Sequence, residues 1–135
     1  MTLRIPNEGE LELLRNMLSG TPAPDLKLKL FTNDIIPGND DTASSYTEMV
    51  GMGYTEKTLA AASWTFAHLS LVAEATHLPQ VWTFTAGGPV TIYGYYVVGA
   101  TDGLLRWAER FTPAFSAEIA GDKLTVTPKM TFSTY

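Results

Sequence analysis

The prediction of the fold starts from the segment PVTIYGYYVVGATDGLLRWAERF, residues 89–111. Its first half, Val90 to Val98, is rich in β-branched and aromatic residues, which favour the pleated surface of a strand. Thr101-Asp102-Gly103 follows, and Asp-Gly between two such runs indicates a tight turn, because Gly adopts the positive φ that the turn requires. The segment therefore predicts a β-hairpin at the centre of an all-β domain.

The two strands of this hairpin differ in their patterns. In the second strand the two faces carry Leu105, Trp107 and Phe111 on one side and Arg106, Ala108 and Arg110 on the other. The first strand is apolar on both faces, which carry Val90, Ile92, Tyr96 and Val98 on one side and Tyr93, Tyr95 and Val97 on the other. A strand of that kind is either covered on both sides or presents an adhesive surface to a partner.

Length and composition describe a single globular domain. At 135 residues the chain can bury about two-thirds of the surface that it exposes when unfolded. Its net charge of −5 and its scattered basic residues argue against binding to a nucleic acid backbone, which needs clustered Lys and Arg. No apolar run is long enough to cross a membrane, and the first residues lack the pattern of a signal peptide. Because the chain has no Cys, disulfides and thiolate metal sites are excluded.

Residues 1–24 form an N-terminal arm that is predicted to contain one short helix. Asn7 is placed as the N-cap, with Glu10 at the spacing of a capping box. Leu11 and Leu14 begin an apolar stripe with helical spacing. This helix either covers one open end or face of the domain or docks onto another subunit.

Residues 25–135 are predicted to form the β domain. Leu26 to Leu30 alternates leucine with lysine, which predicts a half-buried strand with its lysines outward. Residues 34–58 are rich in turn formers, and so long a loop commonly binds a ligand or wraps a neighbouring molecule. Further strands are predicted at residues 59–71, 81–85, 115–119 and 124–132, with turns at 73–79 and 120–122, a break at Thr112-Pro113 and an edge or bulge at Pro128.

This arrangement of strands and turns predicts a β-sandwich of the jelly-roll or immunoglobulin-like kind. We expect about seven or eight antiparallel strands, together with the one short N-terminal helix. Trp64, Trp82 and Trp107 are expected in the core, because large aromatic residues dominate small β cores.

Residues suited to catalysis are few. The only histidines, His68 and His77, lie near one predicted turn and are expected to be solvated or singly hydrogen-bonded. Nucleophilic triads and metal sites usually need His or Cys. No spacing singles out a pair for glycoside hydrolysis among Glu48, Glu56, Glu74, Glu109 and Glu118. We therefore predict a protein without enzymatic activity and without catalytic residues.

Two acidic features stand out in this pattern. Glu109 falls on the inward face of its strand, so it is expected to pair with an arginine or to lie at a strand end. Asp34, Asn39, Asp40 and Asp41 could offer oxygen ligands to Ca²⁺, but their spacing is not that of an EF-hand, and such turns are common without metal. We predict no metal site and no cofactor.

Four tyrosines are expected on the surface, namely Tyr46, Tyr54, Tyr93 and Tyr95. Exposed tyrosines can stack on sugars or anchor a protein interface, because they bring contact area at low entropic cost. With Leu11 and Leu14 of the predicted helix, they are the candidate interface residues.

Several motifs, in one order over nearly the whole chain, carry a resemblance to a known family. They are IPNEGELELLRNML (5–18), LKLKLFTNDIIPG (26–38), SWTF (63–66), VWTFTAG (81–87), TIYGYYVVGA (91–100) and LLRWAERF (104–111). In this layout the chain resembles small structural proteins encoded by tailed bacteriophages, cyanophages among them. The resemblance implies a virion component, assembled in the host cytoplasm, that binds the major capsid protein or other virion proteins and forms homo-oligomers, with no nucleic acid or membrane partner.

Two placements in the virion follow from this resemblance. As a capsid cement or decoration protein, the chain would bind neighbouring capsomers of the head shell, with residues 1–24 and 34–58 reaching across them. As a tail-associated fibre, adaptor or receptor-binding module, it would contact host glycans through tyrosine-rich loops. The small chain without a repetitive shaft favours the cement placement, and a glycan-active enzyme is a distant alternative.

Overall fold

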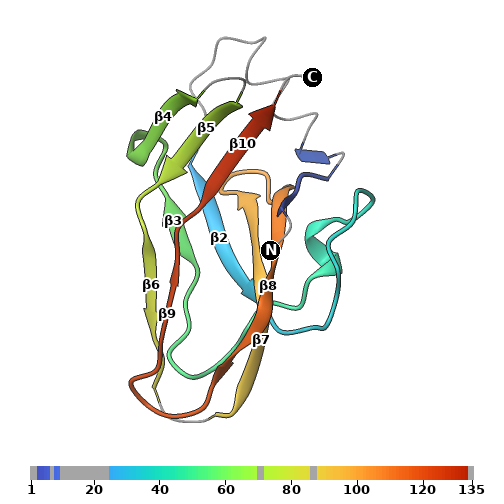
Figure 1. Cartoon of the computed structure of the whole chain (residues 1–135). Helices are drawn as coiled ribbons and strands as arrows, with labels where there is room; N and C mark the ends of the chain where they lie inside the picture. The colour runs from blue at the N-terminus through green and yellow to red at the C-terminus, as the bar shows by residue number, and fades with distance from the viewer. Residues whose placement is uncertain (1–2, 7, 10–24, 70–71, 86–87, 134–135) are drawn as a thin grey trace.

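The computed structural model describes residues 3–6, 8–9, 25–69, 72–85 and 88–133 (Figure 1). This part of the chain is mostly β-strand, arranged in three antiparallel sheets, which confirms the all-β class. The strands are β1 (Leu3–Arg4), β2 (Leu26–Phe31), β3 (Lys57–Leu59), β4 (Trp64–Leu69), β5 (Val72–His77), β6 (Gln80–Thr83), β7 (Val90–Gly99), β8 (Leu105–Ala117), β9 (Lys123–Val126) and β10 (Lys129–Ser133). Two 3₁₀ turns, η1 (Ala43–Ser45) and η2 (Ala61–Ser63), complete these elements. Most of the predicted N-terminal helix lies outside the described residues.

The five-stranded sheet is built around the predicted hairpin. Its strand order is β1-β8-β7-β2-β3, and β7 pairs antiparallel with β8. At the turn Gly103 has a φ of +70°, and the backbone N–H of Leu104 donates to Oδ1 of Asp102 at 2.9 Å. These contacts confirm the Asp-Gly hairpin. The alternating strand β2 lies between β7 and β3, with Leu28 and Leu30 fully buried as expected.

The remaining strands form a three-stranded sheet, β10-β5-β4, and a two-stranded sheet, β6-β9. In Figure 1, β6 and β9 lie below β5 and β10. The chain passes from β5 to β6 and from β9 to β10 at short breaks. The second break contains Pro128, where an edge position or a bulge within one strand was predicted and the strand instead divides in two. The backbone N–H of His77 donates to the carbonyl of Pro128 at 2.9 Å, so the two breaks lie side by side.

Three expectations about where strands run and which strands pair are wrong. The predicted turn at residues 73–79 is largely strand β5, which pairs with β4 on one side and β10 on the other. The predicted hairpin of residues 115–119 with 124–132 does not form, because β9 pairs with β6 and β10 with β5. Thr112-Pro113 does not end the strand, since β8 continues through it to Ala117. The ten described strands therefore exceed the seven or eight expected.

The main core lies between the five-stranded sheet and the other two sheets. One group of buried core residues comes from the first sheet: Leu28, Leu30, Leu59, Ile92, Tyr95, Val97, Trp107 and Ala117. The opposing group comes from β6, β9, β10 and the residue after β6: Trp82, Phe84, Leu124, Val126 and Met130. Trp64 packs at the margin, with its ring 6.0 Å from that of Trp107. The core placement expected for the tryptophans is therefore confirmed for Trp82 and Trp107, with Trp64 partly buried.

Two register shifts change which side chains face this core. Ile92 pairs with Phe115 and Gly94 with Arg110, so residues 111–114 of β8 bulge opposite a single residue of β7. As a result Ile92 and Tyr95 both enter the main core, although alternation predicts opposite faces. In the second shift Val98 pairs with Leu105 and Val97 with Trp107, which places Leu105 and Trp107 in different clusters. The alternation predicted for β7 therefore fails between Ile92 and Tyr95, and that predicted for β8 fails between Leu105 and Trp107.

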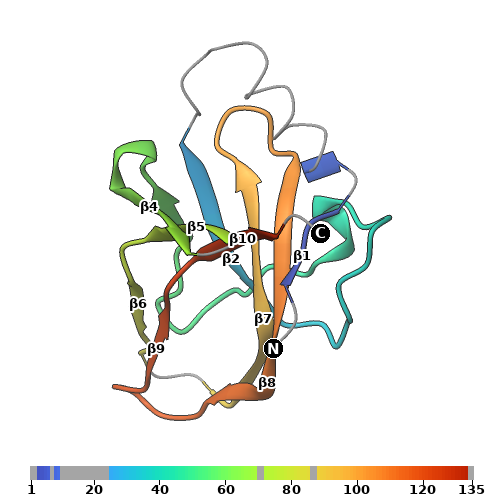
Figure 2. The ribbon, with the colours of Figure 1, turned by 45° about the horizontal axis from the view of Figure 1, so that its top comes forward.

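The long loop predicted at residues 34–58 packs against its own sheet, and its last two residues belong to β3. Met49 and Met52 of the loop enter the main core, whereas its earlier part lies on the opposite face of the sheet. A second buried cluster forms on the face of that sheet away from the main core and contains Phe31, Tyr46, Tyr96, Val98, Leu105 and Ala108. The ring of Tyr46, which follows η1, stacks on that of Tyr96 with centroids 5.0 Å apart. Figure 2 shows the teal segment with η1 on the opposite side of β7 and β8 from β6 and β9. Strand β7 is therefore covered on both faces, by the main core and by the loop.

Candidate functional site

The structure buries half of the tyrosines that the sequence placed on the surface. Tyr46 and Tyr95 are 5% and 1% exposed, so the expected exposure is wrong for both. Tyr54 and Tyr93 are half-buried. The other two interface candidates, Leu11 and Leu14, lie outside the described residues.

Each of these four tyrosines has a charged partner within the domain. The hydroxyl groups donate to carboxylates: Tyr46 to Asp41 at 2.7 Å, Tyr54 to Glu48 at 2.8 Å and Tyr95 to Glu109 at 2.6 Å. The ring of Tyr93 lies 5.2 Å from the guanidinium of Arg110. Burial raises the phenol pKa of Tyr46, Tyr54 and Tyr95 well above its usual value, and the bonded carboxylates raise it further. All three phenols are therefore protonated donors at neutral pH.

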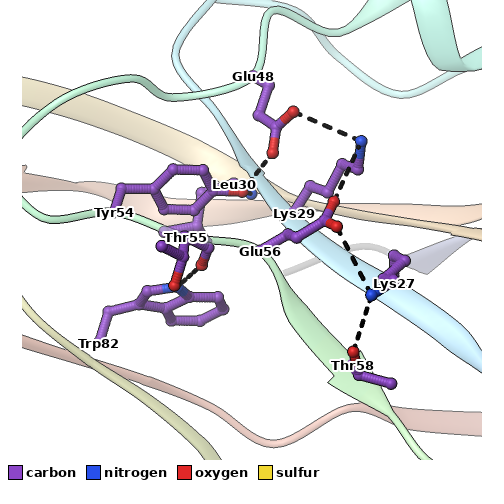
Figure 3. Close-up of polar contacts among 9 residues, drawn as sticks. All are labelled: Lys27, Lys29, Leu30, Glu48, Tyr54, Thr55, Glu56, Thr58 and Trp82. Atoms are coloured by element: carbon purple, nitrogen blue, oxygen red, sulfur yellow. Dashed lines mark hydrogen bonds and ion pairs between the residues drawn. The ribbon is translucent and has the colours of Figure 1, made fainter.

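A charged network covers the outer side of β2 and β3 (Figure 3). The ammonium of Lys29 lies 3.4 Å from a carboxylate oxygen of Glu48 and 3.4 Å from one of Glu56. Lys27 also reaches Glu56, at 3.6 Å. The two lysines and the two glutamates balance in charge, and exposed pairs of this kind stabilise a fold by only about 0–1 kcal/mol each. The outward lysines of the alternating strand thus bind Glu48 and Glu56, both of which were considered for glycoside hydrolysis.

Two carboxylates of the loop of residues 34–58, those of Asp34 and Asp41, form contacts within the domain. Asp34 forms an ion pair with Arg110 at 2.7 Å, and Asp41 accepts bonds from Tyr46 and from the backbone N–H of Gly38. Within the described residues, no group of three or more Asp, Glu or His side chains is placed to hold a metal ion. The helices of the described part include none that is long and apolar enough to span a membrane.

The structure describes the side chain of only one of the two histidines, His77. His77 is 4% exposed, and its Nδ1 lies 2.9 Å from the carbonyl of Leu78. Its ring meets that of Trp64 edge-on, with centroids 5.1 Å apart. The same Nδ1 also lies 3.5 Å from Nε2 of Gln80. The expectation of a solvated imidazole is therefore wrong for His77, which is buried with both polar contacts at one ring nitrogen. The side chain of His68 is outside the description.

An open pocket of about 390 Å³ lies between β8 and β9. Its walls are residues 111–115 of β8 and residues 124–127 around the end of β9, and Tyr95 and Glu109 also line it. The β8 bulge helps to create this space, because it carries four residues away from the regular ladder with β7. Strand β9 pairs with β6 on one edge, and within the described residues no strand pairs with its other edge.

Glu109 supplies a half-buried charge to this pocket. Its Oε2 accepts the bond from Tyr95, whereas its Oε1 has no hydrogen-bond or ion-pair partner among the described residues. Among the described residues no arginine pairs with Glu109: Arg106 binds Asp102 at 2.8 Å and Arg110 binds Asp34. Within the part of the chain that the structure describes, the carboxylate therefore has a hydrogen-bond donor but no compensating positive charge.

A partial signal for this site is visible in the sequence. The inward position of Glu109 between Trp107 and Phe111 is visible in the alternation. The opposite wall is not, because Leu124 and Val126 come from a strand whose pairing partner lies over forty residues earlier in the chain. Comparisons with protein-family models, with curated proteins and with solved structures found no match to this chain.

Proposed function

We propose that this protein is a structural component of a tailed-bacteriophage virion, acting as a capsid cement or decoration protein. In this role it binds neighbouring capsomers of the head shell, through the major capsid protein or other virion proteins, and associates with further copies of itself. The proposal takes its placement from the resemblance of the ordered motifs in residues 5–111. It includes a β-sandwich, of jelly-roll or immunoglobulin-like kind, as the rigid body that is displayed on the shell.

One observation carries the proposal that the domain binds protein: the pocket between β8 and β9. Binding energy at protein interfaces concentrates where a side chain of one partner fills a pocket of the other. Here the pocket is bordered by apolar side chains and by a strand, β9, whose outer edge has no partner strand in the described part of the chain. Such an edge offers backbone donors and acceptors to an added strand.

The pocket is one part of the surface that a stable complex requires. A specific interface buries about 800 Å² on each partner, roughly a tenth of this chain's 7635 Å² of accessible surface. The loop of residues 34–58 cannot contribute as an extended arm, because it packs on its own sheet. It still presents Ile36 and Val50, which are 79% and 83% exposed, as possible additional contacts.

Reconstitution with virus particles tests the proposal. Purified protein is added to heads and to tails separated from particles that lack it, and bound protein is measured by co-sedimentation and located by cryo-electron microscopy. Regular density on the head shell is the expected result. Density confined to the tail would move the protein to the tail-associated alternative, and binding to host glycans would favour a receptor-binding role there. Failure to bind either structure would refute the virion assignment.

A further inference from the structure

We infer that the pocket between β8 and β9 binds an ammonium or guanidinium group carried on an apolar stem, the chemistry of a lysine or arginine side chain. The inference deepens the proposed function by naming the kind of residue that a partner protein would insert. Only the identity of that partner rests on the proposed function, because the chemistry of the pocket can be measured with small cations alone.

The carboxylate of Glu109 sets the charge preference. It is half-buried, and its Oε1 lacks a partner among the described residues, while Tyr95 donates to its Oε2 at 2.6 Å. A carboxylate withdrawn from water favours a nearby cation, because the attraction between opposite charges strengthens as the local dielectric constant falls. Tyr95 fixes the carboxylate in place without neutralising it. A ligand with a positive N–H donor would therefore satisfy both the charge and the open oxygen.

The walls of the pocket suit the stem of such a side chain. Phe111, Phe115, Leu124 and Val126 supply apolar and aromatic surface, and threonines contribute further along the lining. The methylene groups of Lys and Arg pack on surfaces of this kind while the charged end stays near polar groups. Aromatic rings also attract cations that approach their faces. A volume of about 390 Å³ is near the small end of ligand sites, which fits one side chain better than a large cofactor.

No residue in the described part of the chain supplies the missing cation. The two arginines that flank Glu109 most closely on its strand, Arg106 and Arg110, bind Asp102 and Asp34 respectively. The whole chain carries a net charge of −5, so long-range attraction also favours basic groups over acidic ones. The vacant charge partner and the acidic domain therefore point to the same class of ligand.

A ligand series on the unaltered protein tests the charge preference. The full chain, labelled with ¹⁵N, is titrated with n-butylammonium, n-butylguanidinium, n-butanol and butyrate while amide shifts are followed. The two cations should give saturable shifts confined to residues near 109–115 and 124–127, with affinity about tenfold above that of n-butanol, as expected for a hydrogen bond to a charged group. Equal binding of n-butanol and n-butylammonium, or shifts spread over the whole surface, would overturn the inference.

Variants assign the effect to the carboxylate. Glu109→Gln keeps the shape and the acceptor for Tyr95 and should lower the affinity for n-butylammonium about tenfold, the loss expected for a charged hydrogen bond. Glu118→Gln, an exposed carboxylate just beyond the end of the same strand, should leave it unchanged. Ala114→Trp fills the pocket and should abolish binding of both cations. Unchanged affinity in folded Glu109→Gln would overturn the inference.

A last comparison identifies the source of the cation. A blocked lysine peptide, N-acetyl-lysine methylamide, should bind at least as tightly as n-butylammonium if the pocket accepts a side chain of a protein. Rejection of the peptide with retention of the free amine would limit the site to small amines and overturn the protein-side-chain part. If the unaltered protein binds the cations but does not bind virus particles, the virion proposal is refuted and the inference about the pocket stands.

Discussion

Replacing Tyr46 tests whether the long loop is part of the folded domain or a surface for partners. The Tyr46 side chain is 5% exposed, stacks 5.0 Å from the ring of Tyr96 and lies 4.9 Å from that of Phe31. Removing a buried aromatic ring costs about 3–5 kcal/mol, because both apolar burial and packing are lost. We therefore expect Tyr46→Ala to lower the free energy of unfolding by about 3–5 kcal/mol.

A second substitution separates the ring from its hydroxyl group. Tyr46→Phe keeps the stack and loses the 2.7 Å bond to Asp41, so it should cost only about 1–2 kcal/mol. Thr47→Ala, at the exposed next position, is the matched control and should change stability by less than about 0.5 kcal/mol. Urea denaturation followed by circular dichroism gives all three values. A cost for Tyr46→Ala within about 0.5 kcal/mol would show that the loop does not cover the sheet.

Three further substitutions probe the central hairpin. Gly94→Ala should destabilise the fold by about 1–3 kcal/mol in urea, because the new methyl group would overlap the carbonyl of Glu109; an unchanged midpoint would contradict the bulge geometry. Tyr95→Asp should prevent folding, seen as loss of the circular dichroism of the native state, since it buries a charge beside Glu109; a folded variant impaired only in assembly would place that face at an interface instead. Burial alone would raise the pKa of Asp102, but the hydrogen bonds from Arg106 and the Leu104 N–H, with the attraction of Arg106, lower it overall. Its charge therefore stabilises the fold fully above the unfolded pKa of about 3.9, and this stabilisation is lost as pH falls through the lowered pKa of the folded state. Asp102→Asn should accordingly lower Tm at pH 7 and have little effect near pH 2; an equal loss at both pH values would disprove this linkage.

Local patterns in the sequence predict those elements whose pairing is also local. The hairpin of β7 and β8 follows from its Asp-Gly turn, and β2 from its strict alternation. Strand β5 is missed because its sequence, VAEATH, has weak β-propensity, and pairing with β4 and β10 overrides that preference. The partners of β9 and β10 lie more than forty residues away, so neither periodicity nor turn signals reveal them.

The tyrosines and the pocket show why the site was harder to predict than the fold. Alternation counts residues in steps of two, and the two register shifts break that count, once in β7 between Ile92 and Tyr95 and once in β8 between Leu105 and Trp107. Tyr95 was therefore placed on the surface when it lies in the core. The bulge in β8 forms one wall of the pocket. In residues 111–114 the only sequence signal for this bulge is a proline, which was interpreted as a break in the strand. Glu109 was placed inward correctly, but its tyrosine partner depended on the unseen shift.

Because residues 34–46 cover one face of β7, the molecule has a large apolar centre and a small one. A single layer of strands separates the two centres. Local opening of a protein follows the weakest such unit, because its free energy is below that of complete unfolding. The smaller centre is therefore where this domain would first exchange its amide hydrogens and admit proteases. We expect residues 34–46 to open first under stress while the rest of the domain stays folded.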